Sequence, residues 1–276
     1  MKQIRLDGMM IGGGAPFVLI AGPCVIEDEQ KTMEIAVFLK ELTDRLCIPL
    51  IFKASYDKAN RSSLDSYRGP GLDKGLRILE NVGKNLSVPL LTDVHRFEEI
   101  KSAAEVADVL QVPAFLCRQT DFVMEVARLA RVINIKKGQF LAPGDVRNII
   151  EKARSSKNEN IMITERGTSF GYNNLVNDFR AIPIMREMGI PVIFDATHSV
   201  QLPGGLGKVS GGQREMVAYL ARAAVAVGID GLFLEVHPDP DHALCDGPNS
   251  LPLDKLADVL QVLIHLDAIG KNEQSL

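Results

Sequence analysis

The sequence lacks the apolar segments that direct a chain to a membrane or across it. No run of about 18 consecutive apolar residues exists, which excludes a transmembrane helix. The N-terminal sequence MKQIRLDGMMIGGG has no apolar core of the kind that a signal peptide needs. Low-complexity stretches and Pro/Gly/Ser-rich linkers are also missing, which excludes collagen, coiled coil and disorder. We therefore expect a cytoplasmic globular enzyme or binding protein.

An excess of positive charge is missing as well. The chain has 31 Lys and Arg residues against 35 Asp and Glu residues, a net charge of −4, and a pI near 5.8. Nucleic acids and anionic membrane surfaces attract basic proteins. This balance therefore argues against either as a partner.

Cysteine is scarce, and no CxxC pair marks a structural zinc site. In a chain without an export signal the cysteines are expected to be free thiols. Two or three are expected to be small core residues, and at most two are expected to take part in chemistry. The four cysteines are Cys24, Cys47, Cys117 and Cys245.

A short apolar run that ends in a polar residue, followed by a helical stretch, recurs along the 276 residues. Such near-continuous apolar runs fit parallel strands that are buried on both faces. Eight strand–helix units are the count of a (β/α)8 barrel, an α/β fold. The structural alternative is a doubly wound open sheet. The eight runs are Phe17–Gly22, Leu50–Ser55, Pro89–Val94, Val109–Ala114, Val132–Lys137, Ile161–Gly167, Pro191–Thr197 and Gly231–His237.

The whole chain is predicted to form a single barrel domain. Residues 1–16, which contain a DG turn, are predicted to form a short hairpin, and residues 17–276 the barrel. Apolar residues at helical spacing within 35–46 and again within 256–263 predict amphipathic helices. Gly270 is predicted to end the last helix.

Polar residues stand at the carboxyl ends of all eight predicted strands. In barrel enzymes the catalytic groups lie at these ends and in the loops that follow. One polar strand end alone is compatible with a loop that faces solvent, but eight together predict a functional rim. These residues are Cys24, Lys53, Asp93, Gln111, Lys136, Glu165 with Arg166, Asp195 with His198, and Glu235 with His237.

Part of this rim predicts a metal site, because the first, seventh and eighth strands are neighbours in a closed barrel. Thiolate, imidazole and carboxylate ligands suit a divalent ion such as Zn²⁺, Fe²⁺ or Mn²⁺. The competing interpretation is a buried thiol beside a hydrogen-bonded histidine. The candidate ligands are Cys24, His198, Glu235 and Asp246. The rival ligands in the last loop are His237, His242 and Cys245.

Cationic residues also gather at the strand ends of this acidic chain. Cations in the mouth of a barrel predict small substrates that carry phosphate or carboxylate groups. A solvated loop position explains Lys137 well, but it explains Lys53, deep in an apolar run, poorly. The cations are Lys53, Lys58, Arg61, Arg118, Lys136 and Arg166.

Two long loops carry no nucleotide-binding motif. Leu202–Gly212 is rich in glycine, but Val209 follows Lys208 where a P-loop needs Ser or Thr. The segment also opens no dinucleotide-binding unit, so neither ATP nor NAD is expected; a lid or a phosphate-cradling loop fits better. The polar, proline-containing loop His237–Pro252 has the length of a segment that covers a site.

The motifs along the chain resemble those of the 3-deoxy-D-manno-octulosonate 8-phosphate synthases, the enzymes that make the Kdo sugar of lipopolysaccharide. The resemblance covers nearly the whole chain and is carried by AGPC, FKASYDKANRSS, RGPGL, TDVH, QVPAFLCRQTD, NIKKGQF, FGYNNL, FDATHS and EVHPDPDHALCDGPNSLP. It implies a transferase that condenses phosphoenolpyruvate with D-arabinose 5-phosphate and water, without a nucleotide cofactor.

Two alternatives to this activity differ in what they require of the sequence. The related 3-deoxy-D-arabino-heptulosonate 7-phosphate synthases of the shikimate pathway share the GPC start, but KANRSS is typical of the octulosonate enzymes. A sugar-phosphate sensor that kept the barrel without the chemistry would be expected to have lost cations or ligands. Every matching position is filled here.

The resemblance also implies roles for individual residues. A cysteine after the first strand marks the metal-dependent class, so the implied ligands are Cys24, His198, Glu235 and Asp246. The implied catalytic residues are Lys136, His198, Asp246 and Asn60. Cys117 and Cys245 match no ligand of the family and are expected to be structural.

The implied substrate contacts come from several strand ends. Phosphoenolpyruvate is held by Lys53, Lys136 and Arg166, with Lys58 in the same site. The aldose phosphate is held by Asn60, Arg61 and Ser62, and the implied substrate site also includes Asp93 and Gln111. Arg118 matches an arginine that reaches the aldose phosphate from a neighbouring subunit, which implies a homotetramer.

Overall fold

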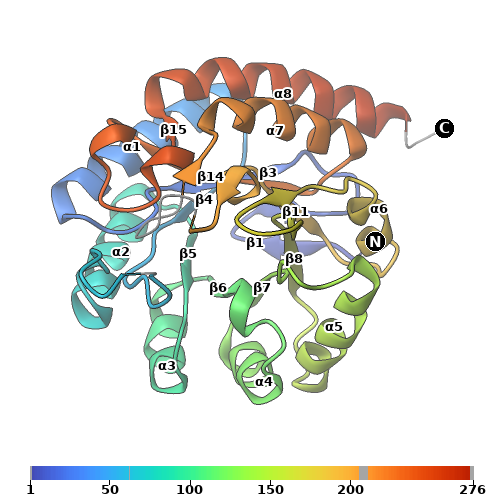
Figure 1. The fold of residues 1–276 in the computed structure, drawn as a ribbon, viewed down its shortest axis with the longest axis horizontal. Coiled ribbons are helices and arrows are strands. Elements are labelled where there is room, and N and C mark those ends of the chain that lie inside the picture. The colour runs from blue at the N-terminus through green and yellow to red at the C-terminus, as the bar shows by residue number, and fades with distance from the viewer. Residues whose placement is uncertain (1, 62, 205–210, 274–276) are drawn as a thin grey trace.

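The structure, a computed structural model, describes residues 2–61, 63–204 and 211–273. Within these ranges eight parallel strands close into a barrel, because β14 pairs with both β3 and β11 (Figure 1). This confirms the predicted barrel and rejects the open sheet. The barrel strands are β3 (Val18–Gly22), β4 (Leu50–Lys53), β5 (Leu90–Asp93), β6 (Val109–Val112), β7 (Val132–Lys136), β8 (Ile161–Glu165), β11 (Val192–Asp195) and β14 (Gly231–His237).

A helix follows each barrel strand and lies outside the ring of strands (Figure 1). The helices are α1 (Glu29–Leu46), α2 (Leu72–Leu86), α3 (Phe97–Val106), α4 (Thr120–Leu129), α5 (Val146–Ser155), α6 (Ala181–Arg186), α7 (Val217–Val227) and α8 (Leu253–Glu273). In α1 the predicted stripe is confirmed, since Ile35, Leu39 and Leu42 are buried. The Asp28 side chain caps this helix by accepting a hydrogen bond from Lys31 N.

Short elements in the loops add small sheets and turns. Two antiparallel pairs are β9 (Thr168–Ser169) with β10 (Leu175–Val176) and β12 (Gln201–Leu202) with β13 (Gly211–Gly212), while β15 (Leu251–Pro252) pairs with the end of β14 in parallel. The 3-10 helices are η1 (Ala114–Leu116), η2 (Pro143–Asp145), η3 (His198–Val200), η4 (Arg214–Met216), η5 (Pro240–His242) and η6 (Gly247–Asn249).

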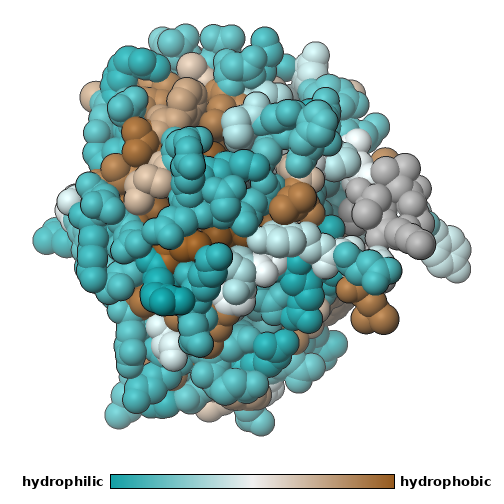
Figure 2. Space-filling view, turned by 90° about the vertical axis from the view of Figure 1, so that its left-hand side faces the viewer, coloured by the Kyte–Doolittle hydropathy of each residue, from teal (hydrophilic) through white to brown (hydrophobic). Residues whose placement is uncertain are grey.

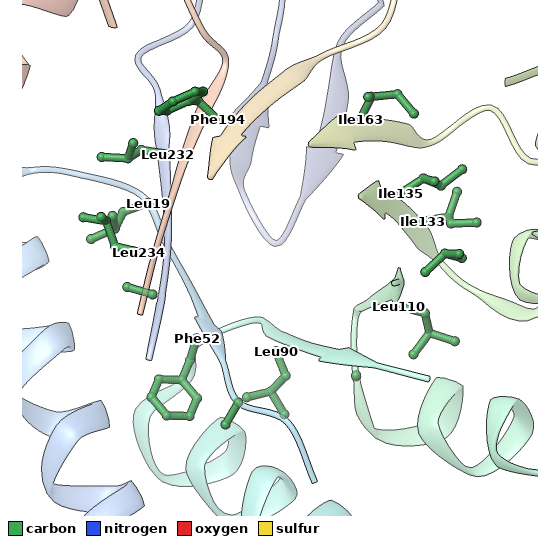
Figure 3. Packing of buried hydrophobic residues seen from close by; sticks show 14 of the residues in the cluster. Leu19, Phe52, Leu90, Leu110, Ile133, Ile135, Ile163, Phe194, Leu232 and Leu234 are labelled. Carbon is green, nitrogen blue, oxygen red and sulfur yellow. The ribbon is translucent and has the colours of Figure 1, made fainter. Parts of the chain in front are cut away.

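The strands separate two apolar cores, because successive side chains of a strand point to opposite faces. Outward residues such as Leu19, Phe52 and Ile163 pack against the surrounding helices (Figure 3). Inward residues such as Val18 and Met162 form a second cluster inside the barrel. Both faces of each of the eight barrel strands are therefore buried, as the continuous apolar runs predict.

The N-terminal hairpin belongs to the inner core. Its strands β1 (Ile4–Leu6) and β2 (Met9–Ile11) pair around Asp7 and Gly8, whose φ angles of 42° and 85° fit a two-residue hairpin turn. Ile4, Leu6 and Ile11 are fully buried against the inward residues of the barrel strands. The predicted hairpin is confirmed, and it fills one end of the barrel.

The inward positions change from apolar to polar toward the carboxyl ends of the strands. On β4, Ile51 belongs to the inner core, and Lys53, two residues later, is a buried cation. On β11 the same spacing separates Ile193 from Asp195. Alternation therefore points the charged strand ends into one space above the inner core.

Two sequence expectations are wrong. Lys137 is not solvated but buried, with 1% of its surface exposed and its Nζ 3.3 Å from both Leu141 O and Thr168 Oγ1. Gly270 does not end α8. The helix continues because Lys271, one residue later, pairs with Asp267, whose carboxylate also accepts a hydrogen bond from Phe17 N.

The face of the molecule that Figure 2 shows is mostly hydrophilic. Figure 2 shows the side of the molecule that lies at the left of Figure 1, where polar residues cover most of the face and apolar residues form small patches. In the described part of the chain, no helix combines the length and apolar character needed to cross a membrane.

Candidate active site

A cavity of about 200 Å³ opens at the carboxyl ends of the barrel strands. Most of the substrate and metal residues predicted from the sequence line it together, although they come from distant parts of the chain. The predicted residues that line it are Lys53, Lys58, Asn60, Arg61, Asp93, Gln111, Lys136, Arg166, His198, Glu235 and Asp246.

Glu235 is the anionic centre of the cavity. Its fully buried carboxylate lies 2.9 Å from Lys53 Nζ and 3.6 Å from Lys58 Nζ. Burial alone would raise the pKa of Glu235, but the charges of Lys53 and Lys58 lower it to about 2. The carboxylate therefore stays ionised and holds the two lysines in place, and Lys53 Nζ also donates to Cys24 O at 2.9 Å.

Lys136 and Asp195 form a second buried ion pair, joined by a hydrogen bond. Lys136 Nζ also lies 3.4 Å from the ring centre of Phe233. Burial lowers the pKa of Lys136 to about 8, although Asp195 opposes the shift. Asp195 accepts a further hydrogen bond from the His198 ring, with 2.8 Å between Oδ2 and Nδ1. Lys136 and the imidazole therefore share one carboxylate.

The predicted metal ligands meet in two overlapping groups. Atom Nε2 of His198 lies 3.7 Å from carboxylate oxygens of both Glu235 and Asp246, and Cys24 Sγ lies 3.4 Å from Asp246 Oδ2. The Oε2 atom of Glu235 is buried and has no hydrogen-bond partner among the described residues. The contact from Asp195 to Nδ1 leaves Nε2 to face the group, the usual arrangement for a ligating histidine. These residues fit a divalent metal ion.

The loop after β14 is held in position by contacts with the loop after β3. Leu244 N donates to Glu27 Oε1 at 2.8 Å, which brings the following residues against Cys24. Asp246 adopts a left-handed backbone conformation, with φ at 46°, and its carbonyl accepts from the backbone N of Asn249 and Ser250. This strained conformation at a functional position orients the Asp246 carboxylate.

Gly22 allows the close contact between β3 and β4 beneath the site. A Cβ atom at this position would lie 1.9 Å from Lys53 O, so no other residue fits without a backbone shift. The AGPC segment therefore brings Cys24 and Lys53 together through a residue without a side chain.

Of the rival ligands, only Cys245 lies in the metal group. Its Sγ is 2.9 Å from Cys24 Sγ and accepts from Arg61 Nη1 at 2.8 Å, so the cysteine that was expected to be structural contacts the site. The other rivals are engaged elsewhere: His237 Nε2 lies 3.4 Å from Glu27, and the exposed His242 pairs with Asp239.

Two arginines carry buried N–H groups that lack acceptors. Arg166 donates to Gln201 from Nη2 at 3.0 Å, but its Nη1 has no partner among the described residues. The Nε of Arg61 is likewise buried and unpartnered there. Burial also lowers the pKa of Arg166. Since unpaired guanidinium donors are costly to bury, both positions are suited to bind anions.

Not every predicted residue meets the cavity. Arg118 is exposed and does not line it. Ser62 and the central part of the glycine-rich loop, 205–210, lie outside the described residues. Cys117 is buried away from the metal group, beside Gly138.

Sequence reasoning placed Asp195 on the predicted rim without a partner, and it gave no role to His95 or Ser55. Asp195 ends a predicted strand, but only the fold shows its pairing with Lys136. His95, in the TDVH segment, lines the cavity with its Nε2 3.3 Å from Asp93 Oδ2. Ser55 Oγ donates to the same carboxylate at 2.5 Å. The polar ends of the apolar runs were the available signal for these residues.

Comparison with known proteins agrees with this geometry. The sequence pattern of the DAHP synthetase I family matches residues 1–272. The chain belongs to the DAHP synthetase I family. Within it, the chain is similar to proteins named 2-dehydro-3-deoxyphosphooctonate aldolase. That of Desulfosudis oleivorans is 66% identical over 95% of this chain and 94% of its own length. Those of Geotalea daltonii and Geobacter metallireducens are 61% and 60% identical, each over 98% of this chain and over 100% and 99% of their own lengths.

The carboxylates around His95 in this DAHP synthetase I family member predict a pH-dependent contribution to stability. Burial alone would lower the pKa of His95, but the hydrogen bond and charge of Asp93 raise it above the ordinary value of 6.5. A raised pKa means that the folded state binds the proton more tightly. The stabilisation is complete below pH 6.5 and is lost as the pH rises through the folded pKa.

We therefore expect His95→Gln to destabilise the protein most in the acidic part of this range. The difference in unfolding free energy between wild type and variant, measured with guanidinium chloride from pH 5.5 to about 9, should shrink as the pH rises. His265→Gln, on the exposed face of α8, is the control and should cost less than about 0.5 kcal/mol. A difference that grows with pH would contradict the assignment.

Proposed function

We propose that the chain catalyses the condensation of phosphoenolpyruvate with D-arabinose 5-phosphate and water, giving 3-deoxy-D-manno-octulosonate 8-phosphate and phosphate. This is the step that forms the Kdo skeleton of lipopolysaccharide. The identity of 66% over 95% of the chain to a protein named 2-dehydro-3-deoxyphosphooctonate aldolase carries the proposal. The cation-rich cavity supports it independently, since both substrates are phosphorylated.

The charges of the cavity suit the two substrates. Phosphoenolpyruvate alone brings roughly −2.5 to −3 charges near neutral pH. Lys53, Lys136 and Arg166 are proposed to bind it, with Lys58 beside them. The unpaired N–H of Arg166 supplies a donor for its phosphate or carboxylate oxygens. The proposed partners of the aldose phosphate are Asn60, Arg61 and Ser62, and Asp93 and Gln111 complete the proposed substrate site.

The reaction forms one carbon–carbon bond and one carbon–oxygen bond to water, and it breaks the carbon–oxygen bond to phosphate; the proton that water loses balances the one that the aldehyde oxygen gains. The vinyl carbon of phosphoenolpyruvate attacks the aldehyde carbon, and water adds to the carbon that bears the phosphate ester. The resulting tetrahedral intermediate then loses phosphate. A pKa of about 8 lets Lys136 hold or release a proton at Nζ during these steps. His198, Asp246 and Asn60 are the other residues proposed to act in the chemistry.

We also propose that the enzyme belongs to the metal-dependent class. Cys24, His198, Glu235 and Asp246 would hold the ion. The buried, unpartnered Glu235 Oε2 and the convergence of imidazole, thiol and carboxylate atoms support this set. A divalent ion bound there would polarise the aldehyde or orient the attacking water.

A cytoplasmic homotetramer completes the proposal. Arg118 is exposed and lies outside the cavity of its own chain, which agrees with a role in the site of a neighbouring subunit. Light scattering measures the molar mass in solution. A monomeric mass at working concentrations would refute the assembly.

The proposed activity is tested by phosphate release from phosphoenolpyruvate with each candidate aldose, in metal-replete protein. Rapid release is expected with arabinose 5-phosphate and little with erythrose 4-phosphate. The opposite preference would indicate a heptulosonate synthase. Release with neither aldose would refute an enzyme of this type.

Lys136→Met is expected to lower kcat by about 100-fold or more, because it removes a preorganised cation from the reacting centre. Methionine keeps most of the side-chain length, so the fold should persist, and the thermal midpoint checks this. Lys74→Met on the exposed surface of α2 is the control and should leave kcat unchanged. A near-normal rate in folded Lys136→Met protein would refute the role of this residue.

Cys24→Ala is expected to lower the content of tightly bound divalent metal from about one ion per chain to nearly none, because it removes the thiolate ligand. Atomic emission on dialysed protein measures this without reference to activity. Cys117→Ala removes a buried thiol away from the group and should keep the metal. Full metal content in Cys24→Ala, or full activity after chelation, would refute the metal-dependent class.

A further inference from the structure

Three inward-facing side chains on neighbouring strands form a buried hydrogen-bonded chain that ends at the cavity. Thr164 Oγ1 on β8 donates to Asn134 Oδ1 at 2.7 Å. Asn134 Nδ2 on β7 then donates to Gln111 Oε1 on β6 at 3.0 Å. Thr164 and Asn134 have no exposed surface, and Gln111 is 5% exposed and lines the cavity.

This chain has a direction. In the structure the Thr164 hydroxyl donates to Asn134 Oδ1, which leaves the N–H groups of the Asn134 amide facing Gln111 Oε1. The carbonyl of Gln111 is thereby engaged, and its Nε2 donates no hydrogen bond to any residue of the described ranges. The free end that Gln111 presents to the cavity is therefore a pair of N–H donors.

The direction matters because of what lies beside Gln111. The neighbouring strand β7 ends in Lys136 and β8 is followed directly by Arg166, so this part of the cavity is suited to an anion. An amide that presents N–H groups adds donors to the cationic set without adding charge. The same amide reversed would present its carbonyl oxygen to the anion, a repulsive arrangement.

We propose that Thr164 and Asn134 are positioning residues, which hold the Gln111 amide with its N–H groups toward the anionic groups of phosphoenolpyruvate. The inference rests on the proposed function, because it takes its ligand from there. Neither residue contacts the substrate. Each acts through Gln111 by setting which end of that amide faces the cavity.

Thr164→Val tests this most directly, because valine has the shape of threonine without the hydroxyl. Asn134 then loses the donor that fixes its orientation, and the Gln111 amide is free to reverse. We expect the KM for phosphoenolpyruvate to rise about tenfold, as when a hydrogen bond to a charged group is lost. The KM for arabinose 5-phosphate and kcat should stay within about twofold.

Two matched variants separate positioning from a structural effect. Thr164→Ser restores the hydroxyl and should return the KM for phosphoenolpyruvate to the wild-type value. Thr92→Val removes another fully buried hydroxyl, which donates to Ala54 O at 2.9 Å outside this chain of hydrogen bonds, and should leave both KM values unchanged.

Asn134→Leu supplies a second, independent test. It interrupts the same chain one step nearer the substrate, so it should raise the same KM. Its effect combined with Thr164→Val should be no larger than its effect alone, because both act through one amide.

Each outcome bears on the proposal. An unchanged KM for phosphoenolpyruvate in active Thr164→Val enzyme would overturn it, and so would equal rises in both KM values or fully additive effects in the double variant. If wild-type enzyme releases no phosphate with either aldose, the proposed function fails and this inference fails with it. Active wild type with an unaltered Thr164→Val variant removes this inference alone.

Discussion

Closure of the barrel between β14 and its two neighbours, β3 and β11, is the constraint on which the site depends. In a closed sheet every second residue of each strand must point into one interior. An apolar residue low on a strand and a charged residue two positions later therefore face the same axis, as Ile51 and Lys53 do. The same alternation of inward-facing side chains therefore builds the apolar core lower in the barrel and the candidate active site above it.

Burying so many charges is tolerated because most of them are paired. Glu235 meets two lysines, and Asp195 meets Lys136 and His198, so each buried carboxylate is balanced locally. Among the described residues that line the cavity, the buried N–H groups left without an acceptor are those of Arg61 and Arg166. A chain with a net negative charge can thus bind anions. The net charge is a sum over the whole molecule, whereas binding in the cavity depends on which of its buried groups are left unpaired.

The sequence predicts the fold and the residues of the site better than it predicts which of these residues contact one another. Strand positions, the hairpin at the DG turn and the polar strand ends follow from local periodicity and turn chemistry. The pairing of Lys136 with Asp195, 59 residues later, and the contact of Cys24 with Cys245 join distant parts of the chain and leave no local pattern. Lys137 and Gly270 were misjudged for a related reason: Thr168 contacts Lys137 from 31 residues away, and Phe17 N donates to Asp267, near Gly270, across 250 residues.

The N-terminal hairpin, which fills the end of the barrel opposite the cavity, limits how molecules can enter and leave the cavity. Ile4, Leu6 and Ile11 occupy the space through which a molecule would otherwise pass along the axis. Along the barrel axis, a molecule that binds near the buried lysines therefore enters and leaves through the same opening, at the carboxyl ends of the strands. In a cavity with one opening, a molecule bound at the closed end can leave only after any molecule bound nearer the opening has left.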